Sequence, residues 1–142
     1  MVSIAVAETT SDLERCFPVM LELRPHLDAV PFLAQVQRQR REHGYRLVYI
    51  EDGGEVRAVA GFRIAEFLAW GKTLYVDDLV TRAVDRSQGY GDRLFDWLVE
   101  HARAQGCDQF HLDSGVQRFG AHRFYLRKRM DIAAHHFAMK LA

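Results

Sequence analysis

The chain has 142 residues, of which 49% are hydrophobic, which is enough for one globular domain over residues 1–142 with its own core. Basic and acidic residues balance at 19 each, so no net field favours a nucleic acid or a membrane surface as partner. The first residues lack the basic and apolar regions of a signal peptide, no segment reaches the length of a membrane span, and we therefore expect a cytoplasmic protein.

The first half of the chain alternates between strand and helix patterns. Ser11 and Glu14 have the spacing of a capping box, which predicts a helix start, and Gly44 is a typical helix stop. Residues 52–54 (Asp-Gly-Gly) predict the turn of a hairpin. The expected elements are a strand at 3–7, helices at 11–23 and 31–43, and hairpin strands at 46–50 and 56–67.

The second half continues with a strand, a helix and a strand. Apolar residues at helical spacing precede Gly106, which predicts the C-terminal stop of a long helix. The expected elements are strands at 74–81, 110–113 and 132–141 and helices at 89–105 and 121–128. The fold class is therefore α/β of the α+β kind, with helices packed on a mixed, mostly antiparallel sheet.

The most informative segment joins the strand at 74–81 to the long helix. Glycines at 89 and 91 remove Cβ atoms where backbone amides can converge, and the start of a helix attracts anions. Arg86 adds a cation next to these glycines. The segment predicts a phosphate-binding loop, although an ordinary loop with glycines for tight packing has the same pattern. A dinucleotide-binding fingerprint fits poorly, because Leu94 stands where its third glycine would be.

The pattern Arg86-x-x-Gly89-x-Gly91 resembles the loop of the GNAT superfamily of acyl-CoA-dependent N-acyltransferases. The resemblance covers nearly the whole chain and is strongest over residues 74–125. It implies a sheet whose strands at 74–81 and 110–113 splay apart, flanked by about four helices. Residues 121–127 resemble bacterial aminoalkylphosphonate acetyltransferases, and residues 74–78 resemble polyamine acetyltransferases.

The resemblance implies an N-acetyltransferase that moves an acetyl group from acetyl-CoA to a primary amine by direct attack through a tetrahedral intermediate. The amides of residues 88–91 would hold the pyrophosphate, the strand end at Leu79 and Thr81 would pair with the pantetheine arm, and Tyr125 would protonate the departing thiolate. The implied coenzyme A contacts are Leu79, Val80, Thr81, Arg86, Ser87, Gln88, Gly89, Tyr90, Gly91, Arg118, Ala121 and Phe124.

Two positions depart from the family's pattern. Arg118 replaces the usual asparagine before the helix at 121–128, which exchanges an amide for a cation. Arg129 replaces the usual glycine after that helix, so we expect the turn there to differ, because a residue with a Cβ tolerates a left-handed cap less well.

An amine must lose a proton to attack a thioester, since only about one primary amine in a thousand is neutral at pH 7.4. Asp77 and Asp78 are the candidate bases, and strand alternation predicts that they point to opposite faces. Asp77 matches the position of a proposed base in polyamine acetyltransferases. Both aspartates could instead attract a cationic substrate or bond to backbone.

Other side chains are interpreted without a catalytic role. The histidines at 111, 122, 135 and 136 lack metal-ligand spacing, so we expect no metal, and Arg38, Arg40 and Arg41 are interpreted as a solvated helix face. A small-molecule amine is the expected partner, and the chain is compatible with a homodimer. Two alternatives remain: a non-catalytic acyl-CoA sensor, and an enzyme that acetylates protein N-termini or lysines.

Overall fold

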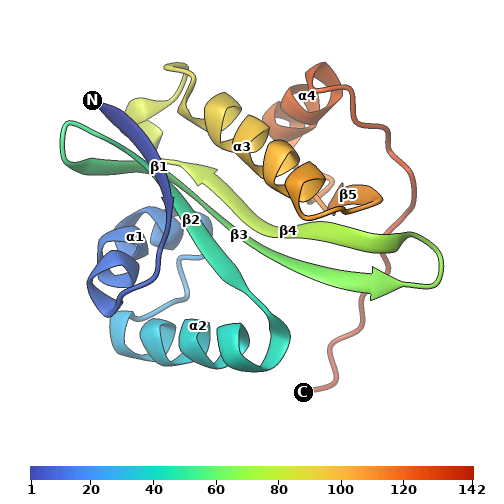
Figure 1. Cartoon of the computed structure of the whole chain (residues 1–142), viewed down its shortest axis with the longest axis horizontal. Coiled ribbons are helices and arrows are strands. Elements are labelled where there is room, and N and C mark those ends of the chain that lie inside the picture. Colours follow the sequence, from blue (N-terminus) through green and yellow to red (C-terminus); the bar gives the residue numbers. More distant parts are fainter. The chain divides into compact units, whose positions relative to one another are not determined.

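The computed structural model describes residues 1–142, which form two compact units, Met1–His111 and Leu112–Ala142. A five-stranded sheet has the order β1-β2-β3-β4-β5, and its first three pairings are antiparallel (Figure 1). The elements are β1 (Val2–Val6), α1 (Thr10–Leu23), α2 (Ala29–His43), β2 (Arg46–Asp52), β3 (Glu55–Phe67), β4 (Gly71–Thr81), a 3₁₀ turn η1 (Ala83–Asp85), α3 (Tyr90–Ala104), β5 (Gln109–Leu112) and α4 (Phe119–Arg127). The α+β class predicted from the sequence is confirmed.

The β2–β3 hairpin forms where the sequence predicts it. Gly53 and Gly54 have φ values of +63° and +79°, as a two-residue turn of type I′ requires, and a side chain is strained in this conformation. This turn fixes the register of the central strands, which pairs Asp52 with Glu55. A bulge between Ile50 and Glu51 shifts the register once within the hairpin.

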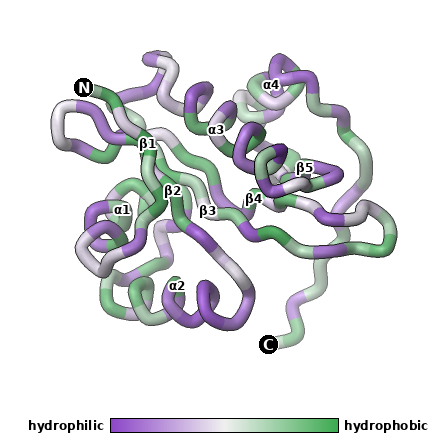
Figure 2. The backbone as a smooth tube through the Cα atoms, in the orientation of Figure 1, coloured by the Kyte–Doolittle hydropathy of each residue, from purple (hydrophilic) through white to green (hydrophobic).

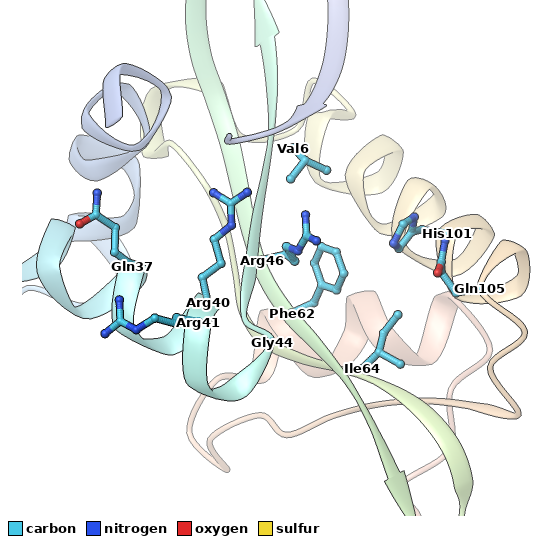
Figure 3. Close-up of a pocket in the computed structure, with 10 residues that line it drawn as sticks. All are labelled: Val6, Gln37, Arg40, Arg41, Gly44, Arg46, Phe62, Ile64, His101 and Gln105. Carbon is cyan, nitrogen blue, oxygen red and sulfur yellow. The ribbon is translucent and has the colours of Figure 1, made fainter. Parts of the chain in front are cut away.

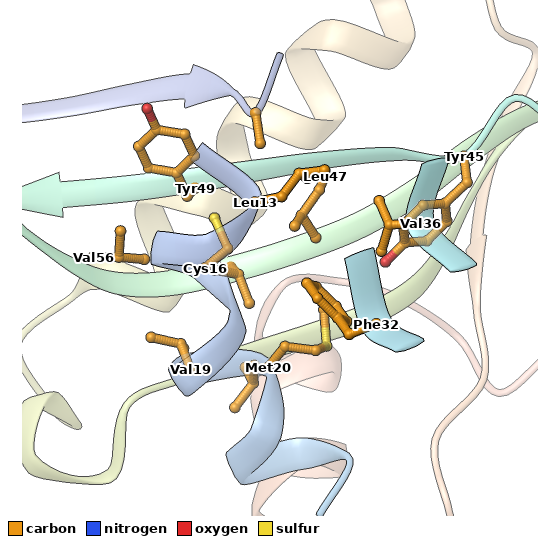
Figure 4. Close-up of a cluster of buried hydrophobic side chains, with 13 residues drawn as sticks. Leu13, Cys16, Val19, Met20, Phe32, Val36, Tyr45, Leu47, Tyr49 and Val56 are labelled. Carbon is orange, nitrogen blue, oxygen red and sulfur yellow. The ribbon is translucent and has the colours of Figure 1, made fainter. Parts of the chain in front are cut away.

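Side-chain alternation along the central strands builds a core on each face of the sheet. On one face, Leu47 and Tyr49 pack in a cluster with residues of α1 and α2, among them Cys16, Met20 and Phe32 (Figure 4). The other face is covered by α3, which buries Leu94, Phe95, Leu98 and Ala102. Full burial of one such large side chain is worth about 1.5–3 kcal/mol. Figure 2 shows the resulting pattern, with hydrophobic central strands and a largely hydrophilic α2.

Both N-terminal helices begin earlier than the sequence predicts. The capping box of α1 is formed by Thr9 and Asp12, not by Ser11 and Glu14: the Asp12 amide donates to Thr9 Oγ1 over 3.0 Å, and the Thr9 amide donates to the Asp12 carboxylate over 3.3 Å. The earlier pair prevails because the Asp12 carboxylate also accepts from the Glu8 amide. Helix α2 begins two residues before Pro31, and a first turn tolerates proline because an N–H at that position would have no acceptor within the helix.

The second unit contains α4 and an extended tail. Arg129 has a φ of +69°, its amide donates to Leu126 O, and the Met130 amide donates to Tyr125 O. This is the Schellman geometry of a glycine cap, so the expectation of a different turn is wrong. The strand expected at 132–141 is also wrong, because these residues form no ladder and a strand is stable only beside a partner strand.

Candidate active site

The segment between β4 and α3 presents backbone amides to solvent. Gly89 is the N-cap of α3 with a φ of +86°, a left-handed conformation that glycine adopts without strain. No side chain caps α3, and the first amides of any helix lack an acceptor within the helix. Residues 86–89 are exposed, and a Cβ at Gly89 would meet no atom within 4 Å. The loop therefore offers open amides at the positive end of a helix, which fits a diphosphate group.

Gly91 serves a different purpose, the close approach of α3 to β4. A Cβ at Gly91 would lie 2.9 Å from Thr81 Oγ1, closer than packed atoms normally come. Only glycine therefore fits here without a shift of α3 or β4.

The outer edge of β4 is covered only in part, because β5 has four residues and β4 has eleven. The Asp108 amide, just before β5, donates to Lys72 O, so β5 lies beside the start of β4. The edge at the end of β4, residues 79–81, is not covered by β5.

Ion pairs and one capping contact hold this loop from behind. Asp85 is 3% exposed, and its carboxylate accepts from Arg82 Nε over 2.6 Å and from Arg57 Nη1 over 3.0 Å. The bond from Arg82, together with Arg57, lowers the pKa of Asp85. The Ala83 amide donates to Glu22 Oε1 over 2.8 Å. The turn before the glycines is thus tied both to β3 and to α1.

Tyr90, the first residue of α3, faces away from the loop's exposed surface. Its side chain is buried, and its hydroxyl donates to Asp52 Oδ2 over 2.7 Å. The Arg57 guanidinium lies 6.0 Å from the centre of the Tyr90 ring. The contact with coenzyme A expected at Tyr90 can therefore come from its amide but not from its ring.

The two candidate bases belong to one network rather than to opposite faces, which corrects the prediction from alternation. The β3–β4 register shifts by one residue at Asp77, so β4 bulges there. Arg63 donates to both carboxylate oxygens of Asp77, over 3.1 and 2.5 Å. The same guanidinium lies 5.7 Å from the centre of the Tyr45 ring, and the Tyr45 hydroxyl donates to Asp78 over 2.8 Å.

Asp77 and Asp78 differ in the partners of their carboxylates. Asp78 accepts from Tyr45 on one oxygen and from Arg24 Nε, 3.0 Å away, on the other. Arg24 also donates to the backbone oxygen of Asp77. Burial raises the pKa of Asp77 although Arg63 opposes the shift, so Asp77 is a stronger base than an ordinary carboxylate. The Asp78 carboxylate links Arg24, the C-cap of α1, and Tyr45 to β4.

Tyr45 is part of this site, and the sequence analysis did not single it out. It is 3% exposed, and burial raises the pKa of its phenol well above the usual value, with Asp78 as the next cause. A Cβ at Gly61 would overlap the Tyr45 hydroxyl, so Gly61 leaves the space that Tyr45 needs. An isolated tyrosine after a helix stop carries no sequence signal for this role. A glycine inside a strand does signal a close approach.

The expected residues of the second unit share one helix. Arg118 is the N-cap of α4, and Ala121 and Tyr125 are one turn apart on it. The rings of Phe124 and Tyr125 meet edge to face, 5.5 Å between centres. Burial raises the pKa of Tyr125, while Arg118 lowers it. The phenol is therefore protonated at neutral pH, as a proton donor must be.

The histidines make pairwise contacts. His111 stacks on Trp70 with 3.8 Å between ring centres, and His136 Nδ1 lies 3.5 Å from an Asp113 oxygen. No group of three or more His, Cys, Asp or Glu side chains is arranged to hold a metal ion. None of the helices combines the length and the apolar composition that crossing a membrane requires.

Two curated relatives carry acetyltransferase names. An uncharacterized N-acetyltransferase of Bacillus subtilis, YhdJ, is 37% identical over 112 residues, which cover 79% of each chain. The aminoalkylphosphonate N-acetyltransferase of Salmonella typhimurium is 38% identical over 53 residues, which cover 37% of this chain and 34% of the relative. The second match is therefore limited to part of each protein.

Solved structures show the same fold. A protein of Bacillus halodurans described as a transcriptional regulator matches with a TM-score of 0.88 at 21% identity over 99% of this chain and 100% of its own. AAC(6')-Iy in complex with a bisubstrate analogue of coenzyme A matches with a TM-score of 0.86 at 11% identity over 100% and 99%. Residues 6–130 match the Acetyltransferase (GNAT) family. With the open glycine loop at the start of α3, these matches show that the chain belongs to the GNAT family of N-acetyltransferases.

Proposed function

We propose that this GNAT enzyme acetylates the primary amine of a small molecule and that residues 1–142 form one catalytic domain. The observation that carries the proposal is the open loop at Gly89, which joins the end of β4 to the start of α3. The hydrogen bonds of Arg57 and Arg82 to Asp85 hold this loop in place. The family uses acetyl-CoA, and an exposed row of helix amides matches the diphosphate of this co-substrate.

The residues around the loop divide the work of binding acetyl-CoA. The amides of residues 88–91 hold the diphosphate, and Arg86 adds a charge-assisted contact. The uncovered edge of β4 at Leu79 and Thr81 supplies backbone groups to the pantetheine amides. When bound, acetyl-CoA supplies a thioester whose carbonyl carbon accepts the amine nitrogen. The N–C bond forms in a tetrahedral intermediate, and the C–S bond then breaks.

The amine proton passes to Asp77 through a water molecule. Asp77 suits this role because burial raises its pKa even though its carboxylate accepts from Arg63. Asp78 is a positioning residue: its carboxylate bonds to Arg24 at the end of α1 and to Tyr45, and so holds the β4 bulge. The thiolate takes its proton from Tyr125, whose phenol has a raised pKa and so carries the proton at neutral pH.

Two relatives support a small-molecule acceptor. The partial match to an aminoalkylphosphonate N-acetyltransferase and the fold shared with AAC(6')-Iy both involve proteins whose names or ligands point to small amines. A cytoplasmic location, a bacterial origin and a homodimer stay predictions, as does the absence of a metal cofactor and of nucleic-acid or membrane partners.

The fold shared with a protein described as a transcriptional regulator keeps the sensor as a second candidate. Acetyl-CoA turnover separates the two: thiol release is measured with aminoalkylphosphonates, polyamines, and peptides with free N-termini or lysines. We expect turnover with at least one small amine and little with peptides. Coenzyme A binding without turnover of any acceptor would favour the sensor, and peptide turnover alone would move the proposal to a protein N-acetyltransferase.

A further inference from the structure

A second concave site lies at the far end of α3 from the glycine loop. It is a pocket of about 660 Å³ in the first unit, where the end of α2, the start of β2, the middle of β3 and the end of α3 meet (Figure 3). His101 of α3 lines it, twelve residues after Gly89. At 1.5 Å per helical residue the two sites are about 18 Å apart along α3. The pocket is thus separate from the loop expected to bind acetyl-CoA, and its volume is typical of a small-molecule site.

Three arginines line the pocket, and no acidic residue does: Arg40, Arg41 and Arg46. In Figure 3 the side chains of Arg40 and Arg46 lie beside the pocket, whereas the Arg41 side chain points away from Arg46, toward Gln37. Glu8, which lies outside the lining, pairs with Arg40 and stands 3.6 Å from Arg46. Arg41 has a single acidic neighbour, Glu42, at 3.9 Å. The single carboxylate of Glu8 thus neutralises only one of the two positive charges of Arg40 and Arg46, and Arg41 is weakly paired. The pocket therefore carries a net positive charge.

Arg38 and Arg41 are exposed, which agrees with the interpretation of a solvated helix face, whereas Arg40 is partly buried. Arg38 does not line the pocket. Arg40 and Arg41 line the cavity together with Arg46 of the following strand. The sequence did not reveal that Arg40 and Arg46 lie beside the same carboxylate, Glu8, because they come together only after Gly44 turns the chain from α2 into β2.

The opposite side of the pocket is aromatic and apolar. Phe62 and Ile64 of β3 line it together with His101. The His101 ring stacks on Trp97, 4.8 Å between centres and 7° between planes, and meets the Phe62 ring edge-on at 5.4 Å. Burial lowers the pKa of His101, and Arg46 lowers it further, so the ring is neutral at pH 7 and adds no charge. Phe62 is only 2% exposed and supports the ring of His101 from behind, so a flat apolar ligand would contact Ile64 and His101.

We infer that this pocket binds a small aromatic anion, with the ring against Ile64 and His101 and the anionic group at Arg40 and Arg46. Guanidinium groups bind carboxylates and phosphates through paired hydrogen bonds, and their planes also stack on aromatic rings. A neutral aromatic ligand would make no ion pair with the arginines, and an inorganic anion would leave the apolar side of the pocket in contact with water. The pocket therefore favours a ligand that has both an aromatic ring and an anionic group.

The test is a calorimetric titration of the full chain, saturated with coenzyme A, with 2-naphthoate. We expect one saturable site with a Kd on the order of 0.1–1 mM. 2-Naphthyl phosphate should also bind, whereas 2-naphthamide and inorganic phosphate should each bind at least tenfold more weakly. Naphthamide that binds as well as naphthoate, inorganic phosphate that binds as well as naphthyl phosphate, or no saturation up to about 10 mM would overturn the inference.

Two variants locate the site, and a third is the matched control. Arg46→Gln removes a guanidinium whose side chain is 48% exposed, so the fold should be kept while naphthoate binding weakens at least tenfold. Ile64→Glu places a carboxylate on the apolar side and should abolish binding. Arg38→Gln changes the same charge on the exposed face of α2 and should leave the Kd unchanged. Wild-type affinity in both pocket variants, with unchanged circular dichroism spectra, would refute the site.

Discussion

Two substitutions at Gly89 test whether the loop before α3 binds the coenzyme A diphosphate. Gly89→Asp and Gly89→Asn have nearly the same shape, and both residues tolerate the left-handed backbone better than other side chains do. The φ of +86° therefore destabilises the folded state of both variants to about the same extent, and the open space around the position excludes a steric difference. The two variants then differ only in the charge of the side chain.

The expected size of the charge effect follows from Coulomb's law. A carboxylate at the N-cap would stand about 5 Å from a phosphate bound at the first amides of α3, where two unit charges repel by about 0.8–3.3 kcal/mol at effective dielectric constants of 80 to 20. We expect the Asp variant to bind coenzyme A at least tenfold more weakly than the Asn variant, which equals about 1.4 kcal/mol. The gap should shrink in about 1 M salt, where the screening length is about 3 Å.

Calorimetric titration of both variants with coenzyme A measures this gap, and thermal unfolding without ligand supplies the control. Since a negative charge stabilises a helix start, the Asp variant should unfold at an equal or higher temperature than the Asn variant. Binding and stability then change in opposite directions, which a general loss of folding cannot produce. Equal coenzyme A affinities for two folded variants would show that no phosphate binds at Gly89.

Four further outcomes are expected. Asp77→Asn should reduce turnover more at pH 7 than at pH 9.5, where more amine is neutral; an equal loss at both would indicate positioning or charge attraction. Tyr125→Phe should leave coenzyme A binding intact and lower kcat and kcat/KM together by about 10², and wild-type turnover would leave Tyr125 a packing residue. The pKa of Asp85 is lower in the folded protein than in the unfolded chain, where it is about 4. The ionised Asp85 therefore stabilises the fold above about pH 4, and this stabilisation is lost as the pH falls through the pKa of the folded protein. Between pH 7 and about pH 3 the unfolding temperature of the wild type should therefore fall more than that of Asp85→Asn, and parallel curves would contradict this assignment. Arg129→Gly should stabilise the chain against denaturant by about 0.5–1 kcal/mol, and destabilisation would show that the arginine side chain compensates for its left-handed backbone.

The features that the sequence predicted well depend on backbone conformations that few residues adopt. Consecutive glycines at 53 and 54 allow a tight turn whose φ angles are both positive, and both are positive in the structure. A glycine between a strand and an amphipathic helix similarly predicts an uncapped helix start, and Gly89 provides it. In these places local chemistry leaves one low-energy conformation, so periodicity and glycine spacing are sufficient.

The features that were missed depend on contacts between distant segments. The strand expected at 132–141 has a suitable pattern, but a pattern does not supply the partner that pairs its backbone groups. The sequence offers two similar capping-box motifs for α1, Ser11 with Glu14 and Thr9 with Asp12. The second forms because the amides of Glu8 and Thr9 both donate to Asp12, and this depends on the chain before the helix. Neither outcome can be derived from one segment alone.

The acidic pair shows why this difference matters for function. Alternation would send Asp77 and Asp78 to opposite faces, where each could be judged as a base on its own. The bulge in β4 instead joins them through Arg63 and Tyr45, and both carboxylates have both oxygens bonded. They differ in their partners, because Asp78 bonds to Arg24 and Tyr45 whereas Asp77 bonds to Arg63, and burial raises the pKa of Asp77. The choice of base therefore depends on the network around the strand rather than on the strand's own pattern. Since Gly61 leaves room for Tyr45, a change at either residue should disturb Asp78 directly and Asp77 through Arg63, which lies over the Tyr45 ring.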